Sequence, residues 1–306
     1  MTRVVAPSRL HFGLLNAGDI PGVPRFGGCG LMIDSPGVAV RVEPAARWHG
    51  EGPAADRAVE FARRVTAEPH RVVVERCPPQ HIGLGVGTSL GLAVAKALRP
   101  DLSTVELALL VGRGLRSGVG LHGFDRGGFI VDAGKVGDAL PGLAAHVSFP
   151  AGWRIVLIVP DQPSPWHGSD ERAAFARRRD PSVAARVAEQ MQHLLMAEIV
   201  PALEAGHFDR FSEGVYEYNR LAGWPFVADQ GGTYSGRVVT AIIDTIREVG
   251  CAGVGQSSWG PAVFALAPDG GQAEYLANVI CGRFAGLRTV EVVTAASCGA
   301  LLDPPG

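Results

Sequence analysis

The segment from Gln80 to Leu90 combines residue types that could bind an anion. Three glycines at alternating positions precede two hydroxyl residues and an apolar run that continues to Leu98. Glycine lets the backbone adopt positive φ angles and approach a ligand closely, and a helix start presents unpaired N–H groups with partial positive charge. These features favour phosphate binding. They predict a phosphorylated substrate or a nucleotide, held by Gly83, Gly85, Gly87, Thr88 and Ser89.

Residues 83–89, here called the phosphate loop, match neither of the two common phosphate motifs. No Lys-Ser or Lys-Thr pair follows the last glycine of this loop, as a P-loop requires, and the dinucleotide spacing with a following acid is absent. Two structural alternatives therefore stay open. The glycines could form an ordinary turn before a buried helix, and Thr88 and Ser89 could serve only as helix N-caps.

Four other segments also combine glycine with polar or charged residues. They cover residues 6–16, 25–34, 113–129 and 253–261. In the first segment, Arg9 and His11 would share one face of a strand, because strand residues two apart point to the same side. Each segment alone could be a turn, but five of them in one chain predict a shared active site.

The composition narrows the class of protein. With 306 residues, 47% of them hydrophobic, the chain can build one large domain or two ordinary ones around a substantial core. The net charge of −2 gives no electrostatic case for nucleic acid or an anionic membrane surface. No apolar run could cross a bilayer, and the N-terminus lacks the apolar region of a signal peptide. Five scattered cysteines are typical of buried thiols in a reducing cytoplasm, so we expect a cytoplasmic protein.

Apolar runs and helical periodicities are interleaved along the chain. Strands are predicted at 3–6, 38–42, 71–75, 129–132, 154–159, 263–267 and 289–294. Helices are predicted at 56–67, 88–98, 104–115, 170–179, 183–203, 209–221, 237–249 and 272–284. Because the helices gather in the second half, the pattern favours an α+β fold over a doubly wound parallel sheet. A domain boundary is predicted at residues 149–152.

The glycine-rich segments, in this order, resemble the motifs of the GHMP superfamily of small-molecule kinases. Residues 7–16, 83–89 and 253–260 look like its three motifs, and the resemblance covers essentially the whole chain. It implies an N-terminal α+β domain at 1–150 with a left-handed crossover, a rare exception to the usual handedness. It also implies a ferredoxin-like C-terminal domain at 151–306 and a homodimer.

The chain departs from this superfamily at Gly120. Many of its kinases keep a catalytic aspartate where this chain reads Ser117-Gly118-Val119-Gly120. Glycine can neither accept a proton nor orient a hydroxyl, so the departure argues against kinase activity without excluding it. Val86 similarly stands where serine is common, which removes one hydroxyl from the phosphate loop.

A narrower resemblance accounts for the departure. Residues 9–16, 25–28, 116–124 and 255–261 are similar to the β-ribofuranosylaminobenzene 5′-phosphate synthase family. That family joins phosphoribosyl diphosphate to 4-aminobenzoate, or to a close relative such as 4-hydroxybenzoate, and releases CO2 and diphosphate. The product contains a carbon–carbon glycosidic bond and belongs to the methanopterin pathway. The resemblance thus implies a pentosyltransferase, and the departing diphosphate implies Mg²⁺ as cofactor.

This chemistry suggests roles for the charged residues in the segments. Arg9, Arg25 and Arg116 are candidate anion clamps, because guanidinium matches phosphate and carboxylate geometry; the alternative for each is a solvated surface charge. His11 and His122 are candidates for proton transfer or phosphate contact, with a purely structural histidine as the alternative. Arg116 and both histidines, together with Asp125, form the predicted catalytic set.

Further candidates concern the metal and the acceptor. Asp125 and Glu171 are candidate Mg²⁺ ligands or partners of the cations. Trp259 could stack on the aromatic acceptor or belong to the core, and residues 166–169 begin a helix that could act as a lid. The other predicted substrate-binding residues are Asn16, Ser117, Gln256, Ser257 and Ser258.

Two other functions stay open at this point. One is an ATP-dependent GHMP kinase of a small alcohol or sugar, and the other is a catalytically silent sensor of a phosphorylated metabolite. An ordinary phosphoribosyltransferase does not fit, because Gly231-Gly232-Thr233 lacks the apolar strand and acidic pair that precede such a loop.

Overall fold

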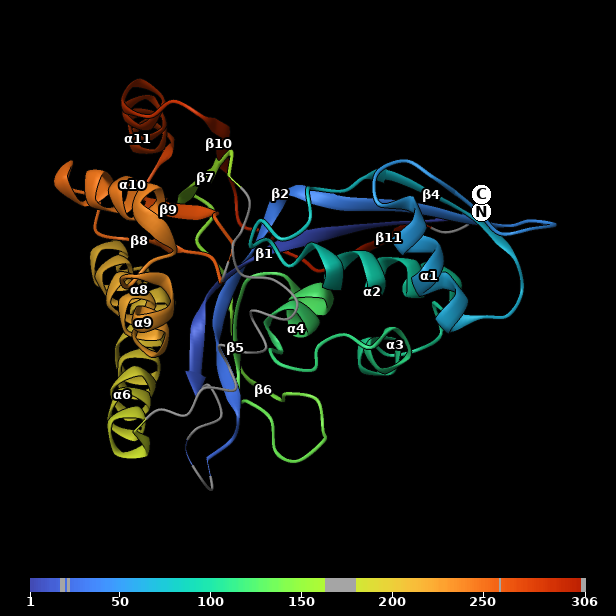
Figure 1. The fold of residues 1–306 in the computed structure, drawn as a ribbon, viewed down its shortest axis with the longest axis horizontal. Coiled ribbons are helices and arrows are strands. Elements are labelled where there is room, and N and C mark those ends of the chain that lie inside the picture. The colour runs from blue at the N-terminus through green and yellow to red at the C-terminus, as the bar shows by residue number, and fades with distance from the viewer. Residues whose placement is uncertain (17–19, 21–22, 163–179, 259, 304–306) are drawn as a thin grey trace.

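The protein contains two β-sheets that lie side by side, each covered by helices (Figure 1). A computed structural model describes residues 1–16, 20, 23–162, 180–258 and 260–303. The first sheet has seven strands in the order β11-β1-β2-β4-β3, and β5 and β6 extend it from β2. Its strands are β1 (Thr2–Asn16), β2 (Phe26–Pro44), β3 (His49–Glu51), β4 (His70–Arg76), β5 (Phe129–Asp132), β6 (Leu143–Val147) and β11 (Leu301–Asp303).

The long antiparallel pair of β1 and β2 forms the centre of this sheet. Their register runs from Thr2 opposite Val42 to Asn16 opposite Phe26, with bulges between Ala6 and Ser8 and between His11 and Gly13. Within the described residues, β3 and β4 form the one parallel pair, and α1 (Ala55–Val65) connects them. This β–α–β unit is a crossover connection between two parallel strands.

Four helices accompany the first sheet, and α2 is the most buried of them. It has an apolar sequence on all sides, and ten of its residues are buried between the sheet and its neighbours. Helices that are apolar all round belong in a core. The helices are α1, α2 (Val86–Leu98), α3 (Thr104–Val111) and α4 (Val119–Arg126).

The second sheet has the strand order β10-β7-β9-β8, all antiparallel. Numbered along the chain, this is the order 4-1-3-2 of a ferredoxin-like sheet, with α11 between the third and fourth strands. Its elements are β7 (Arg154–Pro160), β8 (Val254–Gln256), β9 (Val263–Ala267), β10 (Leu287–Val293), α10 (Gly236–Glu248) and α11 (Gly270–Arg283).

One core cluster contains residues of both sheets, and a second cluster lies on the other face of the second sheet. On β7, Ile155 and Leu157 belong to the cluster that also contains Phe12 of β1 and Phe211 of α8 (Phe208–Gly223), whereas Val156 packs with residues of α10 and α11. The predicted boundary near residue 150 falls between β6 and β7, although β11 returns to the first sheet. The helices stacked beside the sheets (Figure 1) are α6 (Pro181–His193), η1 (Leu194–Ile199), α7 (Val200–Glu204), α8 (Phe208–Gly223), η2 (Trp224–Phe226) and α9 (Val227–Gln230).

Every predicted strand and helix within the described residues is present, but some bounds differ, and β3, β6, β8, β11 and the first part of β2 lie outside the predicted strands. The helix predicted to reach Leu115 ends at Val111, because Gly112 caps it in the left-handed region with φ 65°. The helix predicted at 183–203 contains the π-helical turn η1, which lies before Pro201, a residue without an N–H group. The segment at 117–126, treated above as a possible turn, forms α4. The helix predicted at 170–179 lies outside the described residues.

Candidate active site

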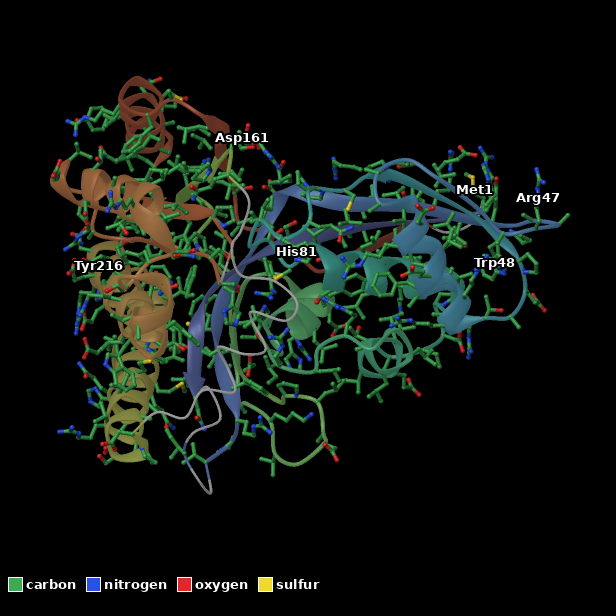
Figure 2. All side chains as sticks on the ribbon, viewed as in Figure 1. Met1, Arg47, Trp48, His81, Asp161 and Tyr216 are labelled. Carbon is green, nitrogen blue, oxygen red and sulfur yellow. The ribbon has the colours of Figure 1, made fainter. Side chains whose placement is uncertain are left out.

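A cavity of about 560 Å³ lies between the part of the molecule built on the first sheet and the part built on the second sheet. These parts are the two halves of the molecule. Its wall combines β1, the phosphate loop, the segment between α3 and α4, the end of α8 and the turn after β8. His81, just before the phosphate loop, marks this junction in Figure 2. The five glycine-rich segments of the sequence therefore contribute unequally: four of them line the cavity, and the segment beginning at Arg25 does not.

The phosphate loop delivers the N-terminus of α2 to the cavity. Gly85 is the N-cap with φ 67°, its carbonyl accepts from the Thr88 amide, and no side chain caps the helix. Gly83, Gly85, Gly87 and Thr88 line the cavity, as expected for a loop that presents amides and a helix dipole to an anion. Ser89 does not line it: its buried hydroxyl donates to the Pro7 carbonyl at 3.0 Å.

Four arginines line the same cavity. Arg9 comes from β1, Arg57 from α1, and Arg113 and Arg116 from the segment after α3. The Nη2 atoms of Arg57 and Arg113 both lie 3.0 Å from the position that a β-carbon on Gly87 would occupy. Two guanidinium groups therefore converge on the middle of the phosphate loop.

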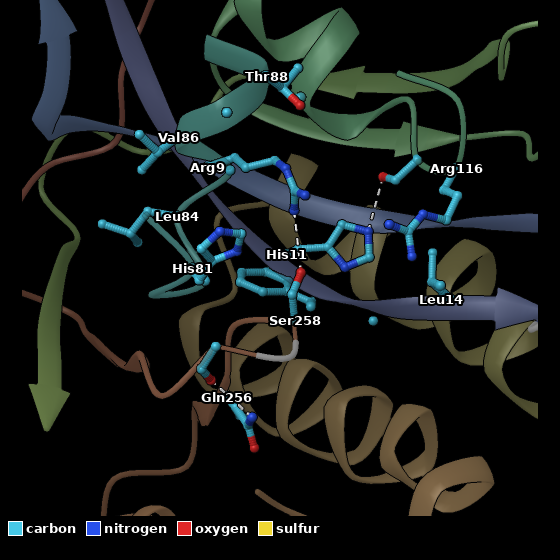
Figure 3. Close-up of a pocket in the computed structure, with 18 of the residues that line it drawn as sticks. Arg9, His11, Leu14, His81, Leu84, Val86, Thr88, Arg116, Gln256 and Ser258 are labelled. Atoms are coloured by element: carbon cyan, nitrogen blue, oxygen red, sulfur yellow. Dashed lines mark hydrogen bonds between the residues drawn. The ribbon is translucent and has the colours of Figure 1, made fainter. Parts of the chain in front are cut away.

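Arg9 lines the cavity beside Gly85 and Gly120, and its guanidinium group points toward Ser258 (Figure 3). Its Nε lies 2.7 Å from a β-carbon position on Gly85 and 3.2 Å from one on Gly120. Its Nη1 donates to the Ser258 hydroxyl at 3.3 Å. Both glycines thus leave room for a cationic side chain, and Gly120 is the residue that the sequence resemblance sets against the kinase aspartate.

His11 lies beside Arg9 on the same face of β1, as the alternation predicts (Figure 3). Its Nε2 is 3.0 Å from the Ser117 hydroxyl, which in turn donates to Oδ2 of Asp132 at 3.2 Å. The side chain is almost fully buried. Burial, reinforced by the charge of Arg9, holds the pKa of His11 well below its ordinary value of 6.5, so the ring is neutral.

The C-terminal half contributes a hydrogen-bonded wall. Gln256 accepts from the Ser235 amide at 2.8 Å and donates to the Gly260 carbonyl at 2.9 Å. Ser257 accepts from the His11 amide at 2.9 Å and donates to the Gly83 carbonyl at 2.8 Å. Gln256 and Ser258 line the cavity, whereas Ser257 is fully buried and joins the two halves behind it.

The backbones of the two halves also touch directly. The Ala262 amide donates to the Ile82 carbonyl at 3.1 Å. A β-carbon on Gly260 would lie 2.1 Å from the Gly83 nitrogen, so only glycine permits this approach. The phosphate loop is therefore fixed to the turn after β8.

Several predicted residues lie away from the cavity wall. Asn16 donates to the Pro24 carbonyl at 3.1 Å, and the Arg25 amide donates to the Lys135 carbonyl at 2.9 Å. A ring nitrogen of His122 is 2.9 Å from the Pro141 carbonyl, and Asp125 accepts from Thr104 at the exposed end of α4. Glu171, Trp259 and the predicted lid at 166–169 lie outside the described residues.

Neither Arg57 nor Arg113 was predicted individually as a site residue, although Arg113 begins the glycine-rich segment 113–129. Arg57 is on an amphipathic helix, where an arginine looks like a solvated charge, and its Nη1 donates to Gln80. Arg113 follows α3, within a span predicted to be helical. Only the packing of α1 and α3 against α2 brings both guanidinium groups to the loop.

The described part of the site offers little to a metal ion. Among the described residues that line the cavity there is no Asp or Glu, and no group of three potential metal ligands occurs in the described chain. Mg²⁺ is usually held by one or two carboxylates together with substrate oxygens. The described residues therefore do not fit a metal bound by the protein itself.

No helix within the described ranges is both long and apolar enough to traverse a bilayer.

The fold is shared with GHMP enzymes of known structure. Homoserine kinase from Cytophaga hutchinsonii matches with a TM-score of 0.70 at 15% identity, covering 99% of this chain and 97% of that one. Mevalonate diphosphate decarboxylase from Staphylococcus aureus matches with a TM-score of 0.63 at 15% identity, covering 99% of each chain. The family model described as GHMP kinases C terminal matches residues 199–286.

Sequence relatives are narrower in kind. The β-ribofuranosylphenol 5′-phosphate synthase of Methanothermobacter thermautotrophicus is 30% identical, with 86% of this chain and 88% of the relative covered. The enzyme of the same name from Archaeoglobus fulgidus is 28% identical, with 87% and 88% covered. A likeness of this extent, on a GHMP fold with glycine at position 120, shows that the chain belongs to the β-ribofuranosylphenol 5′-phosphate synthase family.

Proposed function

We propose that this protein transfers the 5-phosphoribosyl group of phosphoribosyl diphosphate to a para-substituted benzoate, with loss of diphosphate and CO2. The observation that carries the proposal is a cavity with four arginines, a glycine-rich helix N-terminus and no carboxylate among its described lining residues. Such a wall suits a substrate with several negative charges. The relatives' product is a ribofuranosylphenol, so we propose 4-hydroxybenzoate as the first acceptor and 4-aminobenzoate as the alternative.

The phosphate loop is the proposed donor site. The amides at Gly83–Thr88 would bind phosphate oxygens, and Arg57 and Arg113 would neutralise charge on the departing diphosphate. Fixed donors aimed at a developing charge stabilise the transition state without reorganising. Arg9 and Arg116 would hold the remaining anionic groups of donor and acceptor.

In the proposed reaction, the anomeric carbon and the ring carbon that carries the carboxylate each lose one bond and gain one. The anomeric C–O bond to diphosphate breaks, and a C–C bond forms to the ring carbon that carries the carboxylate. The C–C bond to the carboxylate then breaks, CO2 leaves, and its electron pair restores the aromatic ring. The protein contributes chiefly position and charge, because these two ionic substrates must be held in contact.

We propose apolar cavity residues as the acceptor's surroundings. Phe12 and Leu14 of β1 and Phe226 of η2 line the cavity and could pack against a benzoate ring. Trp259 stays a prediction for the same role. Asn16, Arg25, His122 and Asp125 stay predictions, although they do not line the cavity. Glu171, which lies outside the described residues, also stays a prediction.

The metal, the assembly and the location are further proposals. Mg²⁺ would arrive with the phosphates of the donor, and we assign it no protein ligand and no step. The homodimer, the cytoplasmic location and the division at 150/151 rest on the resemblance and on composition. Gel filtration with light scattering would test the dimer.

The decisive experiment supplies phosphoribosyl diphosphate with carboxyl-labelled 4-hydroxybenzoate and measures diphosphate and labelled CO2. We expect equal amounts of both, and the same assay with 4-aminobenzoate would rank the acceptors. ADP formation from ATP and a small alcohol would support the kinase instead. Diphosphate release without CO2 would contradict the proposal.

Arg116→Ala provides a variant of the site, and Arg126→Ala provides the control. Arg126 is exposed at the end of α4, outside the cavity. Arg116→Ala should reduce turnover on the order of a hundredfold, because it removes a charged contact to a substrate anion, while circular dichroism stays unchanged. Wild-type turnover in this variant would remove Arg116 from the site.

A further inference from the structure

Asp132 is a buried carboxylate next to the cavity but not in its wall. It ends β5 and is 1% exposed. Its Oδ2 accepts from the Gly118 amide at 2.9 Å and from the Ser117 hydroxyl at 3.2 Å, and its Oδ1 accepts from the Gly134 amide at 3.0 Å. Burying an ionised carboxylate costs free energy that its hydrogen bonds must offset. The three donors around Asp132 therefore point to a role for this side chain.

The hydrogen bonds of Ser117 determine where its proton lies. The Val119 amide donates to its oxygen at 3.2 Å, and the His11 ring nitrogen Nε2 approaches it at 3.0 Å. A hydroxyl has one proton and two acceptor sites, and an ionised carboxylate only accepts. If Ser117 donates to Asp132, its oxygen must accept from Val119 and from a proton on Nε2 of His11.

The other ring nitrogen of His11 is then left as an acceptor. Neutral imidazole carries one N–H, so a proton on Nε2 leaves Nδ1 with a lone pair. No described residue forms a hydrogen bond with Nδ1, and His11 lines the cavity. Figure 3 shows the ring of His11 with one nitrogen in a hydrogen bond, drawn as a dashed line, and the second nitrogen on another side of the ring.

We propose that Asp132 is a positioning residue, which acts through Ser117 to hold His11 in the Nε2–H tautomer and so presents Nδ1 as a proton acceptor to the acceptor substrate. The identity of that substrate rests on the proposed function. For 4-hydroxybenzoate, the proton is that of the para hydroxyl group. A phenolate donates electron density to the ring carbon opposite it, which is the carbon that must attack the anomeric centre.

The step balances without another reactant. Nδ1 takes the phenol proton, the C–C bond forms as diphosphate leaves, and the ring becomes a cyclic dienone that carries both ribosyl and carboxylate groups. Departure of CO2 returns an electron pair to the ring and regenerates the phenolate. His11, now protonated on both nitrogens, returns its proton to that oxygen and is restored.

The charged and titratable surroundings favour this arrangement around neutral pH. Arg9 faces His11 and disfavours its cation. Around Asp132 lie His122, Cys29 and Tyr218; burial raises its pKa, opposed by the amides of Gly134 and Gly118. In acid, a protonated Asp132 could donate to Ser117, reverse the chain of donors and move the proton of His11 to Nδ1, so turnover should fall on the acid side.

The direct test is the tautomer of His11, which needs no substrate. Protein labelled with ¹⁵N-histidine has nine histidines, and His11→Gln assigns the signal of His11. We expect the wild type to show a neutral ring with the proton on Nε2. Ser117→Ala removes the group that accepts this proton, and Asp132→Asn replaces the ionised acceptor, so both should move the ring nitrogens toward a mixture of tautomers. Asp138→Asn, an exposed acid in the next turn, should leave the spectrum unchanged.

Kinetics provide the second readout. In Ser117→Ala and Asp132→Asn, kcat should fall about tenfold to a hundredfold, whereas the KM for phosphoribosyl diphosphate should stay near that of the wild type. A Nδ1–H tautomer in the wild type, or an unchanged tautomer in both variants, would overturn the inference. Absence of wild-type turnover with a Nε2–H ring would instead reject the proposed function and leave the positioning role standing.

Discussion

Gly120 has a physical role at the residue scale, beyond the loss of a kinase carboxylate. A β-carbon there would stand 3.2 Å from both Cδ and Nε of Arg9, which is tight contact, and 3.4 Å from Thr88. An aspartate at this position would place its carboxylate against the guanidinium group that we assign to a substrate anion. Glycine therefore keeps the positive charge of Arg9 directed at ligands.

Gly120→Asp should weaken donor binding, because a carboxylate beside Arg9 neutralises it and repels phosphate. We expect the Kd for phosphoribosyl diphosphate, measured by calorimetry, to rise at least about tenfold, roughly 1.4 kcal/mol. Gly120→Ala tests for crowding alone and should change the Kd less. Equal effects of both substitutions would show that volume, not charge, matters at this position.

The buried neutral His11 makes stability depend on pH. In the folded protein its pKa lies well below 6.5, so below that pH the unfolded chain binds a proton that the native state does not. The free energy of unfolding should therefore fall as pH decreases, by up to about 1.4 kcal/mol per unit from this group. Urea unfolding of the wild type and His11→Gln at about pH 7.5 and 5.5 checks this sign.

The free energy of unfolding of the wild type minus that of His11→Gln should become smaller as the pH falls. Asp132 acts in the opposite sense, because a raised carboxyl pKa makes the native state bind its proton more tightly. Both proteins keep Asp132, so the comparison removes its contribution to first order. A difference that is constant with pH would mean that His11 has the same pKa in the folded and the unfolded protein.

At the scale of elements, hydrophobic periodicity predicted most of the strands and helices. It did not predict where glycine or proline ends or alters an element. The predicted strands and the described helices all exist, since their apolar patterns match single buried faces. The strand before Val38 was not predicted: β2 begins at Phe26, in a glycine cluster where Gly28 and Gly30 permit backbone to approach within 2.3 Å of a β-carbon position. That need for close packing is tertiary and leaves no periodic pattern.

Asn219 connects three elements. Its Nδ2 donates to the Phe12 carbonyl of β1 at 2.7 Å and to the Gln256 carbonyl of β8 at 2.9 Å, and its Oδ1 accepts from the Gln256 amide at 2.9 Å. Each of these backbone groups would be left buried without its partner if the amide were removed. The position of Gln256 in the cavity wall therefore depends on α8.

Asn219→Ala should lower the free energy of unfolding by on the order of 3 kcal/mol, because buried polar groups lose their partners. Chemical denaturation measures this loss. The control is the neighbouring Arg220→Ala, which removes only an exposed ion pair with Glu217 and should cost less than about 1 kcal/mol. Similar losses in the two variants would contradict a connecting role for Asn219.

At the scale of the whole molecule, the cavity joins segments that are distant in sequence. The glycine motifs could be predicted from sequence because they are local, and so could the pairing of Arg9 with His11. The roles of Arg57 and Asp132 could not be predicted, because an arginine on an amphipathic helix and an acid ending a strand have unremarkable local patterns. Arg113 was marked only as the first residue of a glycine-rich segment. The positions of Arg57 and Arg113 arise from the packing of α1 and α3 against α2, and Asp132 is placed by β5, which pairs with β2 and packs on α4.

Arg57→Ala and Arg113→Ala should each raise the KM for phosphoribosyl diphosphate about tenfold or more, since each removes a guanidinium group near Gly87. Initial rates measured against donor concentration would show this, with the KM for the benzoate little changed. Arg63→Ala on the exposed side of α1 is the matched control. A change in the benzoate KM alone would move these arginines to the acceptor's side.

The contact of Gly260 with Gly83 has a mechanical consequence. Widening the cleft by swinging one half away from the other would break the Ala262–Ile82 and Ser257–Gly83 hydrogen bonds in every turnover. Substrates and products should instead enter and leave through the open side, or mouth, of the cavity, while the contact between Gly260 and Gly83 stays closed. Any hinge in the catalytic cycle then belongs to the segments at that mouth, and the bond-forming centre keeps its shape while reactants come and go.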